Sequence, residues 1–140
     1  MSSGALSRNQ EMNQNLKQND YVINKAFFGK DNCLKVMLNG SGDCYFHFGF
    51  MDKTKNAWIW KKIKFNDMEL GSIVLVLDGR KKNVSFFHSF KDTKTQIWVS
   101  SDKDYVFLKI KEMSKSLSQG EQQVLKVLLE YIILRINMNI

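Results

Sequence analysis

Two predicted strands, over residues 57–65 and 103–111, each place two aromatic side chains and then two lysines on one face. These eight residues are Trp58, Trp60, Lys62, Lys64, Tyr105, Phe107, Lys109 and Lys111. Because side chains alternate along a strand, the aliphatic residues between them belong on the opposite face, against a core. An exposed ring stacks on an unpaired base with about 1–3 kcal/mol, and a lysine neutralises phosphate charge. The pattern therefore predicts a surface for single-stranded nucleic acid, since a duplex hides its bases in the stack.

Two further groups of residues extend this predicted surface. Trp98 alternates with apolar neighbours over residues 95–99, which places its ring on the same kind of face. The basic turn of Arg80, Lys81 and Lys82 is a second candidate for phosphate contact. Two alternatives remain open. The aromatic face meets another polypeptide in a structural or protein-interaction module, or the bound polymer is RNA, in an RNA-binding or annealing protein.

No group of residues has the spacing of a catalytic or metal site. Cys33, Cys44, His47 and His88 carry atoms that can bind a metal, but their spacing matches no zinc pattern. The glycine-rich segment 39–42 is not followed by the lysine of a phosphate-binding loop and is interpreted as a hairpin turn. We therefore expect a protein without enzymatic activity, metal, cofactor or small-molecule substrate.

Composition predicts one folded domain with a basic surface. The chain has 140 residues, 44% of them hydrophobic and 12% aromatic, and a formal net charge of +7. Its size suits a single core, and its charge favours polyanionic partners, nucleic acid before an anionic membrane. Residues 1–20 are rich in Ser, Asn and Gln and predict a flexible polar tail, which leaves residues 21–140 as the domain. The sequence shows no secretion signal, which favours an intracellular protein of the cytoplasm, nucleoid or an organelle.

Alternation of apolar and polar residues predicts a series of strands interrupted by one helix. The expected strands cover residues 34–38, 44–50, 57–65, 84–90, 95–99 and 103–111, with a poorly defined first strand within 21–28. Residues 66–79 fit either a strand entering a hairpin at Asp78-Gly79 or a helix capped by Asn66 or Asp67, and the capping residues favour the helix. Residues 113–117 form a short apolar–polar segment. The order predicts an α+β fold with two small antiparallel β-sheets packed around a two-helix kernel.

A long C-terminal helix is predicted from Ser118 to about Met138. Ser118 and Glu121 fit a capping box, and the residues after them leave only a narrow polar strip. A helix that is apolar nearly all round must be covered on several sides, so we expect a homodimer or homotetramer that associates through it. The residues expected at this interface are Leu125, Leu128, Leu129, Ile132 and Ile136. The alternative is a helix buried in a monomeric core, while Glu130 and Arg135 argue against a membrane span.

Several short motifs resemble the Whirly family of single-stranded-DNA-binding proteins, whose fold recurs in kinetoplastid guide-RNA-binding proteins. Trp60-Lys61-Lys62 and Glu69-Leu70-Gly71-Ser72-Ile73 are similar to the Trp-basic strand and the Glu-hydrophobic-Gly-Ser/Thr-hydrophobic helix of that family. Ser85-Phe86-Phe87-His88 stands in place of its Phe-Phe-His strand, and residues 105–136 resemble its closing strands and hydrophobic helix. Gly29-Lys30 matches only part of its Lys-Gly-Lys motif.

The resemblance spans residues 28–136. It implies two antiparallel sheets packed around helices, and protomers that associate through those helices. It also implies nucleic acid that lies across the sheets and between adjacent protomers.

Overall fold

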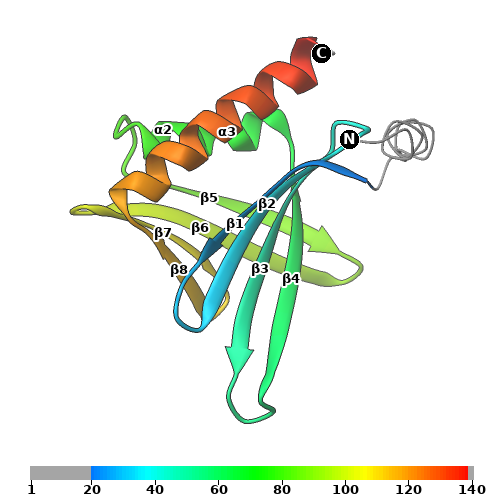
Figure 1. Ribbon diagram of the computed structural model, residues 1–140, viewed down its shortest axis with the longest axis vertical. Coiled ribbons are helices and arrows are strands. Elements are labelled where there is room, and N and C mark those ends of the chain that lie inside the picture. The colour runs from blue at the N-terminus through cyan, green and yellow to red at the C-terminus, as the bar shows by residue number, and fades with distance from the viewer. Residues whose placement is uncertain (1–19, 139–140) are drawn as a thin grey trace, which may run out of the picture.

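The computed structural model describes residues 20–138, except for the side chain of Phe90. Most of the tail predicted for residues 1–20 therefore lies outside the described residues, as do residues 139 and 140. Within the described range the chain forms eight strands and two helices (Figure 1).

Two antiparallel four-stranded sheets follow each other along the chain, and each is a simple meander. Sheet A contains, in spatial order, β1 (Tyr21–Phe28), β2 (Asn32–Asn39), β3 (Cys44–Asp52) and β4 (Ala57–Phe65). Sheet B contains β5 (Asn83–Phe90), β6 (Thr93–Asp102), β7 (Tyr105–Ile110) and β8 (Met113–Leu117). The helix α2 (Asp67–Leu77) connects the sheets, and α3 (Gln119–Met138) follows sheet B. The two helices pack together; in the view of Figure 1 they lie above sheet B and beside the upper ends of the strands of sheet A.

This architecture confirms the predicted α+β fold class and the helix within residues 66–79. Strand β8 is not among the predicted strands. Its inward-facing residues are Met113, Lys115 and Leu117, so a lysine interrupts the apolar alternation that marks a strand. Lys115 is only 3% exposed, and its Nζ donates a hydrogen bond to the Ser116 carbonyl oxygen at 2.8 Å. A buried lysine with a local acceptor is a tertiary feature that alternation does not reveal.

The start of α2 is fixed by a carboxylate with two roles. Asn66 Oδ1 accepts a hydrogen bond from the Glu69 N–H at 2.8 Å, and Glu69 Oε1 accepts one from the Asn66 N–H at 3.0 Å. The other oxygen of Glu69, Oε2, lies 2.7 Å from Nε2 of His88 on β5. Glu69 therefore closes the capping box of the helix and also joins the helix to sheet B.

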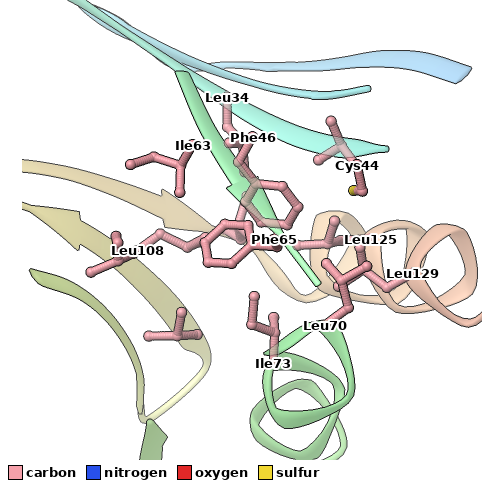
Figure 2. Packing of buried hydrophobic residues seen from close by; sticks show 14 of the residues in the cluster. Leu34, Cys44, Phe46, Ile63, Phe65, Leu70, Ile73, Leu108, Leu125 and Leu129 are labelled. Atoms are coloured by element: carbon pink, nitrogen blue, oxygen red, sulfur yellow. The ribbon is translucent and has the colours of Figure 1, made fainter. Parts of the chain in front are cut away.

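Phe65, at the end of β4, lies at the centre of the core, where both sheets and both helices meet (Figure 2). Its ring packs edge-on against Phe46 at a centroid distance of 4.8 Å and against Phe86 at 5.6 Å. Leu70 from α2 and Leu125 from α3 pack around it and are 0% exposed. Because apolar side chains from every layer join one cluster, the two sheets share a single core.

The core covers one side of α3 and leaves the other side exposed. Leu125, Leu129 and Ile132 are buried within the chain itself, and Leu128 and Ile136 are partly buried. The three buried residues cannot touch a second copy directly, so the residues available to a partner differ from those predicted. The large apolar side chains exposed along α3 are Val124, Val127, Tyr131, Leu134 and Met138. Neither helix within residues 20–138 has the length and apolar content needed to cross a membrane.

We expect Glu69→Ala to lower the free energy of unfolding by about 2 kcal/mol, because it removes the Glu69 half of the capping box, which accepts from the Asn66 N–H, and the contact with His88. Urea unfolding followed by circular dichroism measures this change. Glu130→Ala is the control, since Glu130 is exposed on α3, and it should change stability by less than about 0.5 kcal/mol. Equal stability of the two variants would contradict the role given to Glu69.

Candidate nucleic-acid interface

The outer face of sheet A, turned away from the core, carries two tryptophans side by side. Trp58 and Trp60 stand two residues apart on β4, so their side chains share a face. Their rings are stacked, with centroids 5.8 Å apart and an interplanar angle of 23°. They are 41% and 38% exposed. These two rings, here called the tryptophan platform, form a rigid apolar surface on which a flat ligand such as a base can stack.

Gly49 allows the ring of Trp60 to lie flat on the sheet. The two residues are paired across β3 and β4, and a Cβ atom at position 49 would meet ring atoms of Trp60 at 2.5, 2.6 and 2.8 Å. The ring reaches across to His47, with centroids 4.7 Å apart, and Lys35 Nζ lies 4.7 Å from its centroid. The absence of a side chain at position 49 therefore decides where the Trp60 ring lies.

Lys62 is held against the rings of two tyrosines. Its Nζ donates a hydrogen bond to Tyr21 Oη at 2.8 Å and lies 4.4 Å from the centroid of Tyr45, a cation–π contact. Lys64 forms an ion pair with Asp43, with 3.1 Å between Nζ and Oδ1. The hydrogen bond between them lowers the pKa of Asp43 and raises the pKa of Lys64. Within the described residues Lys62 thus contacts two neutral tyrosine rings, whereas the ammonium group of Lys64 is paired with a carboxylate.

His47 is the titratable group in the middle of this face. It is paired with Lys35 on β2 and with Lys62 on β4. Partial burial, followed by the charges of Lys35 and Lys62, lowers the pKa of His47 below its ordinary value of 6.5. The imidazole is therefore neutral at about pH 7 in the free protein. An anion placed between the two lysines would oppose this effect.

The outer face of sheet B carries a second aromatic surface. Trp98 is 44% exposed and Tyr105 is 49% exposed, while Phe107 is half-buried, its ring centroid 6.2 Å from that of Tyr105. Trp98 is paired with Lys109, so a lysine stands directly beside the indole. Phe87 lies on the same face and is 67% exposed, although it is not among the predicted site residues. The structure thus brings four predicted residues of sheet B together, three of them with rings, and Phe87 adds a fourth ring.

A groove of about 650 Å³ lies between β4, the edge strand of sheet A, and the β5–β6 hairpin of sheet B. We call it the inter-sheet groove. Its lysines are Lys61, Lys62, Lys64, Lys91 and Lys111, and no acidic residue of the described chain lines it. Tyr45 and Lys62 belong both to this groove and to the outer face of sheet A. The face that carries the tryptophan platform is therefore connected to the basic inter-sheet groove through these two residues.

The predicted basic turn lies at the other end of sheet B. The Lys82 carbonyl oxygen accepts a hydrogen bond from Ser101 N–H at 2.9 Å, which fixes the turn beside the start of β5. Arg80 Nε lies 3.9 Å from Asp78 Oδ2. Neither Arg80, Lys81 nor Lys82 lines the inter-sheet groove, which opens where β5 ends. The structure does not bring this turn together with the tryptophan platform.

Four residues of the sheet A surface are absent from the predicted site: Tyr21, Lys35, Tyr45 and His47. Tyr45 and His47 alternate with Phe46 and Phe48 along β3, so the period of two was a usable signal for them. Tyr21 and Lys35 approach the site only through the pairing of β1, β2 and β3. Alternation in β2 indicates the face on which Lys35 lies, but the sequence of one strand does not show which residues of the other strands lie beside Lys35 or Tyr21.

The cysteines offer no reactive group to this surface. Cys33 and Cys44 are both unpaired and 0% exposed. Burial raises the pKa of Cys44 to about 12, so its thiolate is not populated at neutral pH. Across residues 20–138, no three side chains of His, Cys, Asp or Glu converge as metal ligands would.

Comparison with solved structures finds the same fold in other proteins. WHY1 from Arabidopsis thaliana has a TM-score of 0.59 and 15% identity, covering 88% of this chain and 95% of that chain. WHY3 from the same plant has a TM-score of 0.57 and 12% identity, covering 82% and 88%. MRP1/MRP2 from Trypanosoma brucei has a TM-score of 0.55 and 13% identity, covering 99% and 96%. No family model and no curated protein matches the sequence. At such identities the likeness shows the fold alone.

Gly49→Ala should displace the Trp60 ring, because the added methyl group would overlap it. We expect the tryptophan emission to shift to longer wavelength and the free energy of unfolding to fall by about 1–3 kcal/mol. Gly71→Ala is the matched control, since a Cβ atom at this position in α2 meets nothing within 4 Å. It should keep the emission unchanged and raise stability by about 0.5–1 kcal/mol. An unshifted spectrum in Gly49→Ala would show that Trp60 does not depend on Gly49.

Proposed function

We propose that this chain is a non-catalytic protein that binds single-stranded nucleic acid, DNA in preference to RNA, with little dependence on base sequence. The tryptophan platform carries the proposal. Two stacked indoles remain about two-fifths exposed on a folded surface, although burying such large rings would stabilise the chain. Lys35 and Lys62 lie beside them with their charges directed at the same face. This combination suits a flat ring joined to an anion, which describes a nucleotide.

Each part of the polymer has a partner in this proposal. Bases stack on Trp58 and Trp60 of sheet A and on Trp98, Tyr105 and Phe107 of sheet B. Phosphates contact Lys62 and Lys64 on sheet A and Lys109 and Lys111 on sheet B. Duplex DNA offers phosphates but keeps its base faces stacked, so only a single strand can use both kinds of contact.

The fold supports nucleic acid as the class of ligand. WHY1, WHY3 and MRP1/MRP2 share the architecture, and nucleic-acid binding is associated with it at the level of the fold. Motifs such as Glu69-Leu70-Gly71-Ser72-Ile73 resemble the Whirly family in particular, which favours single-stranded DNA. RNA is the second candidate, because the fold of the Whirly family recurs in kinetoplastid guide-RNA-binding proteins. The likeness to MRP1/MRP2 of Trypanosoma brucei is similar in extent to the likeness to WHY1 and WHY3.

We also propose that copies of the chain associate through the outer face of α3, as a homodimer or homotetramer. Its five exposed apolar side chains are Val124, Val127, Tyr131, Leu134 and Met138, between 44% and 62% exposed. An apolar surface of this kind on one helix is typical of an interaction site. Association through α3 would leave the outer faces of both sheets open to a ligand.

Trp58→Ala should weaken the binding of a fluorescein-labelled oligothymidine about tenfold, because one stacking contact is lost. Fluorescence anisotropy measures the affinity, and the wild-type value should fall steeply between low and moderate salt. Ile59→Ala is the matched control, since Ile59 is equally exposed at 41% but lies on the opposite face of β4. Trp58→Phe should keep most of the affinity. Wild-type binding that is equal for single strand and duplex would reject the proposal and favour an unspecific basic surface.

The affinity of the protein for oligothymidine should rise as the pH falls from about 7.5 to about 5.5. The pKa of His47 is below its ordinary value in the free protein, so binding of a phosphate near Lys35 and Lys62 raises it and takes up a proton. Proton uptake on binding means tighter binding at lower pH. Anisotropy titrations at several pH values measure this effect, and His47→Gln should remove it. A pH dependence that persists in His47→Gln would assign the proton to another group.

A further inference from the structure

The inter-sheet groove holds a pair of lysines that come from different sheets. Lys61 lies on β4 between Ile59 and Ile63, on the side of the strand that faces the core. Lys111 stands in the turn between β7 and β8, with a φ of 53°. Figure 1 shows β4 passing beside sheet B, and both lysines line the groove between them. The fold therefore brings together two cations that are 50 residues apart in the sequence.

The two ammonium groups of this pair lie close enough to affect each other. The charge of Lys111 is the main cause that lowers the pKa of Lys61, ahead of burial. Two positive charges at such a distance repel each other, and this repulsion disfavours the free state of the site. An anion placed between them would remove the repulsion and contact both groups.

No acidic side chain of the described chain satisfies this pair. Lysines and arginines of residues 20–138 that form ion pairs include Lys53, Lys64, Arg80 and Lys126. Neither Lys61 nor Lys111 is among them, and the residues that line the groove include no Asp or Glu. Surface lysines usually find a carboxylate or extend into water, whereas these two converge in a groove. The arrangement leaves a place for an anion from outside the chain.

We propose that Lys61 and Lys111 together bind one phosphodiester of the nucleic acid, which passes from the tryptophan platform through the inter-sheet groove. The inference rests on the proposed function and adds to it a path and a residue, Lys61, that the predicted site lacks. A groove of about 650 Å³ is large enough for a nucleotide. Lys62 and Tyr45 line both the groove and the outer face of sheet A, so the path is continuous.

A phosphodiester suits this site better than a carboxylate of an acidic peptide. The groove opens beside the tryptophan platform, on which a base can stack. The backbone of an acidic peptide has no flat ring that would use this platform. Thr93 and Thr95 on the β5–β6 hairpin add hydroxyl groups to its wall, and a phosphate accepts hydrogen bonds on several oxygens. An acidic peptide remains a distinguishable outcome of the experiment below.

The test compares Lys61→Gln, Lys111→Gln and the double variant with Lys103→Gln. Lys103 is the matched control for Lys111, because it stands in the turn at the opposite end of sheet B with nearly the same φ, 56°. Anisotropy with labelled oligothymidine measures affinity at about 50 mM salt. We expect each single groove variant to bind about fivefold more weakly, and Lys103→Gln to bind as the wild type does. Urea unfolding confirms that all four variants fold.

The double variant tests whether the two lysines share one phosphate. Either single substitution already removes the repulsion between the two lysines that phosphate binding relieves. The fold-loss of affinity in the double variant should therefore be smaller than the product of the two single fold-losses. A loss equal to that product would mean two independent contacts and would overturn the shared site. Groove variants that match Lys103→Gln would overturn it as well. Displacement of oligothymidine by polyglutamate at equal charge concentration would assign the groove to acidic peptides instead.

A second arm separates failure of this site from failure of the proposed function. Tripolyphosphate carries the same anionic groups without bases, and calorimetry measures its binding to the wild type and to the double variant. If the wild type binds tripolyphosphate and the double variant does not, the phosphate site is supported, whether or not oligothymidine binds. If the wild type binds tripolyphosphate but not oligothymidine, the proposed function alone is rejected. Oligothymidine binding that depends on Trp58 but not on Lys61 or Lys111 rejects the groove site alone.

Discussion

The helices cover only one face of each sheet, and this constraint decides what the other faces can do. On β4 the core takes Ile63 and Phe65, which are 8% and 1% exposed. Because side chains alternate along a strand, burying this set presents Trp58, Trp60 and Lys62 to solvent. A domain with two helices and two four-stranded sheets therefore keeps two open faces in its described part. In this chain both faces carry rings and lysines, so the same alternation that builds the core also builds the candidate interface.

The core and the candidate interface are mechanically linked through the segment that joins β4 to β5. Phe65 ends β4 inside the core, Asn66 caps α2 directly after it, and Glu69 holds His88 of β5. His88 also lines the inter-sheet groove. The contact between Glu69 and His88 therefore joins the two walls of the groove, together with the packing of Phe65 against Phe86 and His88. A change at Glu69 would affect both the stability of the fold and the geometry of the groove.

Local patterns in the sequence were sufficient for the parts of the structure that depend on local geometry. Alternation predicted which side of β4 carries Trp58 and Trp60, and capping residues predicted α2, because both signals come from neighbouring residues. Contacts between distant segments were not predictable in this way. The hydrogen bond from Lys62 to Tyr21 depends on the register of four strands, and the approach of Lys61 to Lys111 depends on how two sheets pack. On α3 the composition showed apolar residues all round, but only the tertiary structure decides which of them enter the core.

Both sheets are open, so each has edge strands whose backbone groups have no neighbouring strand within the described chain. Exposed edges invite pairing with other copies and, in the extreme, fibrous aggregation. The β4 edge carries Lys61, Lys62 and Lys64, β8 is only five residues long, and β1 has an irregular register near Tyr21. Like charges along an edge oppose its extension into a larger sheet. A polyanion that neutralises these lysines removes part of that protection, so the ratio of protein to polyanion would govern whether a complex stays dispersed or precipitates.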